Sequence, residues 1–173
     1  MISADRIEKI KAIVLDIDGV LTDGRVGYDG EREIKFFNTR DGHGIKMAMR
    51  AGLKVGLLSG RSCEANRRRA AELGLSFCVE KCLNKRDGFL EILAQQQLAA
   101  DECLYVGDDV VDIPPMRLAG IAVAVADGEE VLDRVADFRT RRAGGHGAVR
   151  EVINWLLAEQ GKLDAVLERY FNE

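Results

Sequence analysis

The 173-residue sequence is poor in proline, cysteine and histidine, with 2, 4 and 2 of each, and it has no long apolar run. No stretch approaches the roughly 18 apolar residues of a membrane helix, so we expect no membrane span. Residues 1–11 are rich in charge, which predicts no signal peptide and a cytoplasmic protein. Scarce proline with 47% hydrophobic residues argues against disorder. The length predicts a single domain, 1–173.

The cysteines and the net charge exclude further classes of protein. Without an export signal, the cysteines are expected to be reduced. A zinc site is not favoured, because Cys78 and Cys82 lie four residues apart while His43 and His146 lie in distant glycine-rich segments. A net charge of -4 weighs against nucleic-acid binding, which usually needs a strong basic excess.

Short apolar runs alternate with helical patterns along the chain. The runs predict buried strands of a parallel sheet at Lys11–Leu15, Lys54–Leu58, Ser76–Val79, Cys103–Val106 and Ile121–Val125. The helical patterns lie at Gly44–Ala51, Glu64–Leu73, Arg86–Gln97, Ile113–Leu118, Glu129–Val135, Ala148–Gln160 and Lys162–Phe171. This alternation predicts a doubly wound, Rossmann-like α/β fold.

Two segments depart from the alternation. Residues 25–39 read as a β-hairpin around Asp29-Gly30, inserted after the first strand. The helical tail within residues 141–173 carries apolar side chains such as Trp155 and Phe171. It either packs on its own domain or contacts a neighbouring subunit.

Polar side chains gather where the predicted strands end. Asp16 and Asp18 follow the first strand, Ser59 follows the second, and Asp108, Asp109 and Asp112 follow a later one. Lys85 opens the helix after the strand at Ser76–Val79. Ligands of open α/β sheets bind beyond these carboxyl ends. Clustered carboxylates need a cation, and oxygen ligands suit Mg²⁺.

The same set of residues predicts phosphoryl transfer. A lysine and a serine can hold phosphate oxygens, one aspartate can attack phosphorus, and a second can act as general acid and base. Other chemistries lack their motifs: there is no G-x-x-x-x-G-K-[ST], no G-x-G-x-x-G and no G-x-S-x-G.

The motifs resemble those of the haloacid dehalogenase superfamily. DIDGVLT at Asp16, then Ser59, Lys85, and GDD with Asp112 occur in the order of that family's four motifs. The resemblance narrows to the 3-deoxy-D-manno-octulosonate 8-phosphate (KDO 8-phosphate) phosphatases. It is carried by DGVLTDG, FNTRDGHGIKM, LLSGRS, NKRDG, YVGDDVVDIPPM, AVAVADG and AGGHGAVREV. It implies a haloacid dehalogenase-like fold with an inserted hairpin and no cap domain.

The resemblance also implies roles for residues. Asp16 is the nucleophile that forms an aspartyl phosphate, Asp18 is the acid and base, and Ser59 and Lys85 hold the phosphoryl oxygens. Mg²⁺ falls on Asp16, Asp108 and the backbone carbonyl of Asp18, with Asp109 or Asp112 acting through water. Substrate contacts, beside those of Asp18, fall on Asn38, Thr39, Arg40, Asp41, Gly42, Lys46, Arg61, Arg69 and Lys85. His146 stands where the family commonly has arginine.

The resemblance implies a KDO 8-phosphate phosphatase of lipopolysaccharide precursor synthesis. It also implies a homotetramer whose sites are shared between protomers, which favours a subunit contact for the tail. Two alternatives stay open. One is a phosphatase for a nine-carbon sugar acid 9-phosphate, against which Arg61 is the main argument. The other is a non-catalytic tetramerising domain related to sugar-acid cytidylyltransferases.

Overall fold

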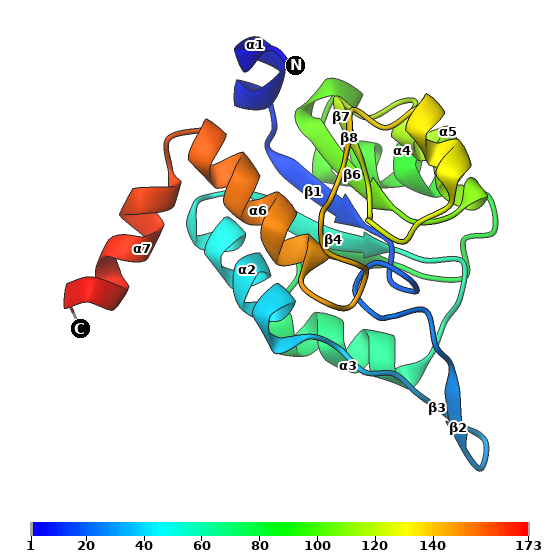
Figure 1. Ribbon diagram of the computed structural model, residues 1–173. Helices are drawn as coiled ribbons and strands as arrows, with labels where there is room; N and C mark the ends of the chain where they lie inside the picture. Colours follow the sequence, from blue (N-terminus) through cyan, green and yellow to red (C-terminus); the bar gives the residue numbers. More distant parts are fainter. Residues whose placement is uncertain (1, 173) are drawn as a thin grey trace.

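The centre of the molecule is a six-stranded parallel sheet in the order β5-β4-β1-β6-β7-β8, seen in a computed structural model that describes residues 2–172 (Figure 1). The strands are β1 (Ala12–Leu15), β4 (Lys54–Leu58), β5 (Phe77–Val79), β6 (Cys103–Gly107), β7 (Ile121–Ala124) and β8 (Phe138–Arg139). β1, β6 and β7 are buried along their whole length, which explains why they read as continuous apolar runs. The predicted doubly wound α/β fold is confirmed.

Helices cover both faces of the sheet. One face carries α2 (Thr39–Arg50), α3 (Glu64–Leu73) and α6 (Ala148–Glu159), and the other carries α4 (Lys85–Gln96) and α5 (Ile113–Met116) (Figure 1). The remaining helices are α1 (Ala4–Glu8), α7 (Leu163–Asn172), and the 3₁₀ turns η1 (Ala100–Glu102), η2 (Val110–Asp112) and η3 (Glu130–Arg134). Strand order reverses between β1 and β6, so the edge where ligands of such sheets bind lies at their carboxyl ends.

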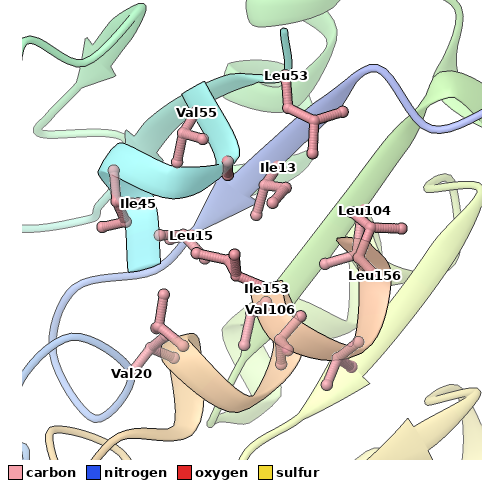
Figure 2. Close-up of a cluster of buried hydrophobic side chains, with 14 of the residues drawn as sticks. Ile13, Leu15, Val20, Ile45, Leu53, Val55, Leu104, Val106, Ile153 and Leu156 are labelled. Carbon is pink, nitrogen blue, oxygen red and sulfur yellow. The ribbon is translucent and has the colours of Figure 1, made fainter. Parts of the chain in front are cut away.

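The main core lies between the sheet and the α2–α6 pair. Ile13 and Leu104 from the sheet meet Ile45 of α2 and Ile153 and Leu156 of α6, and all five are fully buried (Figure 2). The first helix of the predicted tail is therefore part of the domain core. α7 has no buried residue, and Phe171 at its end is 84% exposed. A subunit contact of the tail stays a prediction.

The predicted hairpin is present as β2 (Gly27–Asp29) and β3 (Arg32–Ile34), paired antiparallel. Gly30 turns between them with a φ of +59°, a left-handed conformation that glycine adopts without strain. Within residues 2–172 it is the one insertion after β1, and no cap domain is present. The sequence did not indicate α1 or the two-residue strand β8.

Two predictions on location have different outcomes. Within the described part of the chain, none of the helices has the length and apolar character needed to cross a membrane. The cytoplasmic location stays a prediction.

Candidate active site

The carboxyl ends of β1, β4 and β6 open into a cavity of about 320 Å³. Its lining residues are Asp16, Asp18, Gly24, Ser59, Gly60, Arg61, Cys82, Leu83, Lys85, Asp108, Asp109 and Val111. The predicted catalytic residues Asp16, Asp18, Ser59 and Lys85 are thus brought together. They meet because parallel strands deliver the residues that follow them to one edge of the sheet.

Lys85 places a fixed positive charge beside Asp16. Its Nζ lies 2.9 Å from Asp16 Oδ2 and 2.6 Å from Asp112 Oδ1, with only 3% of the side chain exposed. Burial lowers the pKa of Lys85, but the carboxylates of Asp16 and Asp112 outweigh it, and the pKa is raised overall. The ammonium group therefore stays charged and can hold a phosphoryl oxygen next to Asp16.

Asp112 is a buried carboxylate that accepts several hydrogen bonds at this edge of the sheet. Its Oδ1 also accepts a hydrogen bond of 2.7 Å from the Tyr105 hydroxyl, and its Oδ2 accepts from the backbone N–H groups of Asp108 (3.0 Å) and Asp109 (3.3 Å). With donors on both oxygens, this carboxylate fixes the turn that presents Asp108. Burial and the nearby Asp112 carboxylate raise the pKa of Tyr105 well above its usual range.

Three carboxylates, of Asp16, Asp108 and Asp112, each offer an oxygen within 4.8 Å of the others. Burial, with repulsion from Asp112, raises the pKa of Asp16 to about 6. Burial, with repulsion from Asp16 and Asp112, raises the pKa of Asp108 to about 8. The single charge of Lys85 lowers both pKa values but does not compensate three carboxylates, so the cluster has room for further positive charge.

A divalent cation would supply the positive charge that this cluster of carboxylates needs. Asp108 Oδ1 is buried and has no hydrogen-bond partner among the described residues. Asp112 already uses both oxygens, so Asp16 and Asp108 have the freer ligand atoms. Asp109 is exposed and caps η2 by accepting from the Val110 N–H. An all-oxygen set suits a hard divalent cation.

The hairpin side of the molecule supplies two residues that the sequence did not reveal. Lys35 has a fully buried side chain, and its Nζ lies 2.6 Å from Asp18 Oδ1 and 2.9 Å from Oδ2. Glu33 accepts a hydrogen bond of 2.9 Å from Arg61, whose Nε is 3.9 Å from Asp18 Oδ2. Glu33 and Lys35 are two residues apart in an extended segment and so share one face. This spacing was the sequence signal that could have indicated that both side chains point toward the site.

Several predicted substrate contacts lie away from the cavity. Asn38 caps α2 by accepting from the Arg40 N–H at 2.8 Å, and its Nδ2 donates to the Gly145 carbonyl at 3.1 Å. Asp41 is fully buried and accepts from the backbone N–H groups of Gly147 and Arg150. These two residues therefore have structural partners in this protomer.

The remaining predicted substrate contacts lie on α2 or, for Arg69, on the neighbouring helix α3. Arg69 pairs with Glu72 at 3.0 Å and lies over the Phe37 ring at 5.7 Å from its centroid. A Cβ on Gly42 would come within 2.1 Å of Arg69 Nη2, so this glycine lets the arginine pack there. None of Asn38, Thr39, Arg40, Asp41, Gly42, Lys46 and Arg69 lines the Asp16 cavity. Their contacts with substrate stay predictions.

The fold and the set Asp16, Ser59, Lys85 and Asp108 define a haloacid dehalogenase-like hydrolase, and the model of that family matches residues 42–120. The 3-deoxy-D-manno-octulosonate 8-phosphate phosphatase KdsC of Escherichia coli (strain K12) is 44% identical over 168 residues, covering 94% of this chain and 89% of the relative. The chain therefore belongs to the 3-deoxy-D-manno-octulosonate 8-phosphate phosphatase family of haloacid dehalogenase-like hydrolases, and it is a phosphatase.

Two solved structures agree with this assignment. The Moraxella catarrhalis 3-deoxy-D-manno-octulosonate 8-phosphate phosphatase, in complex with magnesium ion, phosphate ion and KDO, has a TM-score of 0.93 at 33% identity, covering 96% of this chain and 97% of that one. The cobalt-bound enzyme of Haemophilus influenzae has a TM-score of 0.90 at 40% identity, covering 92% and 94%. Metal ions accompany both relatives, in accord with the acidic cluster here.

Proposed function

We propose that this chain hydrolyses KDO 8-phosphate to KDO and phosphate with Mg²⁺ as its cofactor. The observation that carries the proposal is the cavity in which Lys85 Nζ lies 2.9 Å from Asp16 Oδ2 and a buried, unpartnered oxygen of Asp108 faces the same cluster. The relatives named for this substrate support the choice of sugar.

Asp16 is the nucleophile of the proposed reaction. One of its carboxylate oxygens forms a bond to phosphorus as the bond between phosphorus and the sugar oxygen breaks. Asp18 donates a proton to the departing sugar oxygen. In the second step Asp18 takes a proton from water, the water oxygen bonds to phosphorus, and the aspartyl–phosphorus bond breaks to release phosphate. Lys85 and Ser59 hold the phosphoryl oxygens during both steps.

The proposed cation site would use the carboxylates of Asp16 and Asp108 and the backbone carbonyl of Asp18, with Asp109 or Asp112 acting through water. Mg²⁺ supplies positive charge that offsets the charge of the phosphoryl group. Arg61 lines the cavity, and we assign it to the carboxylate of the sugar acid, since a guanidinium pairs with two carboxylate oxygens at once.

A phosphate-release assay with KDO 8-phosphate and the 9-phosphates of nine-carbon sugar acids tests the reaction. We expect hydrolysis with Mg²⁺, none with EDTA, and a higher kcat/KM for KDO 8-phosphate. A preference for a nine-carbon substrate would select that alternative. No hydrolysis of any sugar phosphate would favour the non-catalytic tetramerising domain.

The nucleophile has its own test. Asp16→Asn should lower kcat by roughly 10³-fold or more while the fold is retained, because the amide keeps the shape but loses the nucleophilic oxygen. Asp164→Asn in exposed α7 is the matched control and should leave kcat unchanged. Normal turnover in a folded Asp16→Asn protein would contradict the mechanism.

We also propose a homotetramer with sites shared between protomers. Its support is the apolar surface of the hairpin segment, where Ile34 is 40% and Phe36 is 80% exposed, two residues apart and so on one face of the extended chain. Monomers seldom leave such large side chains grouped in solvent without a partner. Sedimentation analysis should find a tetramer, and Phe36→Ser should shift it toward smaller species. A fully active monomer would contradict the shared site.

A further inference from the structure

A second and larger cavity, of about 690 Å³, lies between the first turns of α2 and α6 and the segment before α6. Its lining residues are Arg40, Arg141, Arg142, Arg150, Glu151 and Asn154. None of these residues lines the Asp16 cavity. The site is therefore separate from the cluster assigned to catalysis, and four of its six residues are arginines.

Among the described residues, the guanidinium groups of this cavity form no direct ion pair, although Asp41 attracts Arg142 and Arg150 through space. Arg150 Nε donates to the neutral Asn154 Oδ1 at 2.8 Å. Within residues 2–172, the side chains of Arg40, Arg141 and Arg142 make no hydrogen bond or ion pair. Arginine side chains that gather without direct ion-pair partners repel one another, and a bound anion would relieve that repulsion.

The nearby carboxylates are already engaged by the backbone. Glu151 accepts from the N–H groups of Arg141 at 2.9 Å and Arg142 at 3.0 Å. Asp41, behind the cavity, accepts from the Arg150 N–H at 2.7 Å. Neither carboxylate has a hydrogen bond to a guanidinium of the cavity, so donor groups of the four arginines stay available to a ligand.

The helices add to the positive potential. Arg40 is the second residue of α2 and Arg150 the third of α6, and both helices have twelve residues. The N-terminus of a helix carries a partial positive charge, so acidic rather than basic residues are favoured there. Asp41 and Glu151 lie in the same first turns and offset part of this positive charge. Their carboxylates accept from backbone N–H groups, so a bound anion would stabilise the two arginines further.

We propose that this cavity binds a small molecule with at least two anionic groups, phosphate or carboxylate. Arginine binds both groups through paired N–H donors. The volume lies within the roughly 300–1,000 Å³ of small-molecule sites, which favours a metabolite over a macromolecule. The ligand has two possible sources: a sugar-acid phosphate, which carries one carboxylate and one phosphate, or an unrelated polyphosphate. Binding does not depend on the proposed catalytic function.

The wall of this cavity connects to the catalytic turn. The Gly145 N–H donates to the Val20 carbonyl at 2.9 Å, and a Cβ on Gly144 would come within 1.6 Å of the Gly19 oxygen. The backbone after Arg142 is thus packed directly on the residues that follow Asp18.

Calorimetric titration with inorganic pyrophosphate tests the proposal. EDTA is present throughout to remove the cation from the Asp16 site, and salt is held at about 150 mM to screen diffuse attraction. The cavity variant is Arg141→Gln with Arg142→Gln, which keeps both backbone bonds to Glu151. Arg117→Gln with Arg134→Gln, two exposed arginines elsewhere, is the matched control. Arg40 is left unchanged because it is a predicted substrate contact.

We expect the cavity variant to bind pyrophosphate at least tenfold more weakly than the unmodified protein, and the control to bind equally well. Equal affinity in the cavity variant, or an equal loss in the control, would overturn the proposal and leave only non-specific attraction. A parallel titration with KDO 8-phosphate distinguishes the sources. If the cavity variant binds KDO 8-phosphate more weakly than the unmodified protein does, the sugar-acid phosphate is a ligand of the cavity. If it binds KDO 8-phosphate equally well but has lost pyrophosphate binding, the ligand is a polyphosphate. Neither result depends on turnover.

Discussion

At the scale of single residues, the most constrained group in the site is Asp112, which is fully buried. A buried carboxylate is tolerated only where hydrogen bonds or opposite charge replace its lost hydration. Here Lys85, the Tyr105 hydroxyl and two backbone N–H groups do so. Asp112 thereby orients both the lysine beside Asp16 and the turn that presents Asp108.

Tyr105→Phe measures one bond of this network. The change keeps the ring and removes the hydroxyl that donates to Asp112 at 2.7 Å. We expect the free energy of unfolding, measured in urea, to fall by about 1.5–3 kcal/mol, the range for hydrogen bonds to charged groups. Tyr170→Phe, which removes a more exposed hydroxyl, should have a smaller effect. An equal or larger loss at Tyr170 would show that the bond to Asp112 adds little.

Part of the site could be predicted from the sequence because it follows strand ends. Asp16, Ser59 and Asp108 each come directly after a recognisable apolar run, and topology alone brings such positions together. Lys35 and Tyr105 could not be found in this way. A lysine in a hairpin reads as a surface residue, and a tyrosine in an apolar strand reads as core. Only the folded distances show that one pairs with Asp18 and the other with Asp112.

At the scale of elements, the strands and most helices were predictable, while the start of α2 was not. The helical pattern in the sequence begins only at Gly44, and Gly42 and Gly44 themselves disfavour helix. The structure begins the helix at Thr39, where Asn38 caps it. The two glycines are tolerated because a Cβ at Gly42 would meet Arg69 and one at Gly44 would come within 2.8 Å of Arg150 Cδ. Tertiary packing overrides local propensity here.

The position of α6 gives a test of its role as a core helix. Leu156→Ala removes a fully buried side chain that packs between α6 and the sheet. We expect a loss of about 2–5 kcal/mol in the free energy of unfolding. Phe171→Ala in α7, where the side chain is 84% exposed, should change it by less than about 0.5 kcal/mol. Similar effects of the two substitutions would contradict the core placement.

The hairpin element offers a test of substrate recognition. Glu33 holds Arg61 at 2.9 Å, so its carboxylate occupies the guanidinium that we assign to the carboxylate of the substrate. Glu33→Gln removes this competitor and should lower the KM for KDO 8-phosphate about two- to fivefold, as expected for a part-exposed ion pair, with kcat little changed. Glu31→Gln at the exposed hairpin turn is the control. A raised KM would mean instead that Glu33 orients Arg61 for binding.

At the scale of the whole molecule, the acidic cluster links stability to pH and to metal. The pKa of Asp16 is raised to about 6 and that of Asp108 to about 8, both above the value of 3.8 that is usual for an aspartate. Without metal, the folded protein thus holds protons that the unfolded chain has already released. Stability from these groups is complete below about pH 4 and is lost as the pH rises through 6 and 8.

A divalent cation reverses this loss, because it stabilises the ionised carboxylates of Asp16 and Asp108 in the folded state alone. The rise in Tm caused by saturating Mg²⁺ should therefore be small near about pH 5 and largest near about pH 8. Thermal unfolding with Mg²⁺ and with EDTA, at equal ionic strength, measures this difference. The variant Asp16→Asn with Asp108→Asn removes both titrating groups, so its Tm should respond little to Mg²⁺ at either pH. A response to Mg²⁺ that is equal at the two pH values in the unmodified protein would show that the cation does not bind where these two carboxylates release their protons.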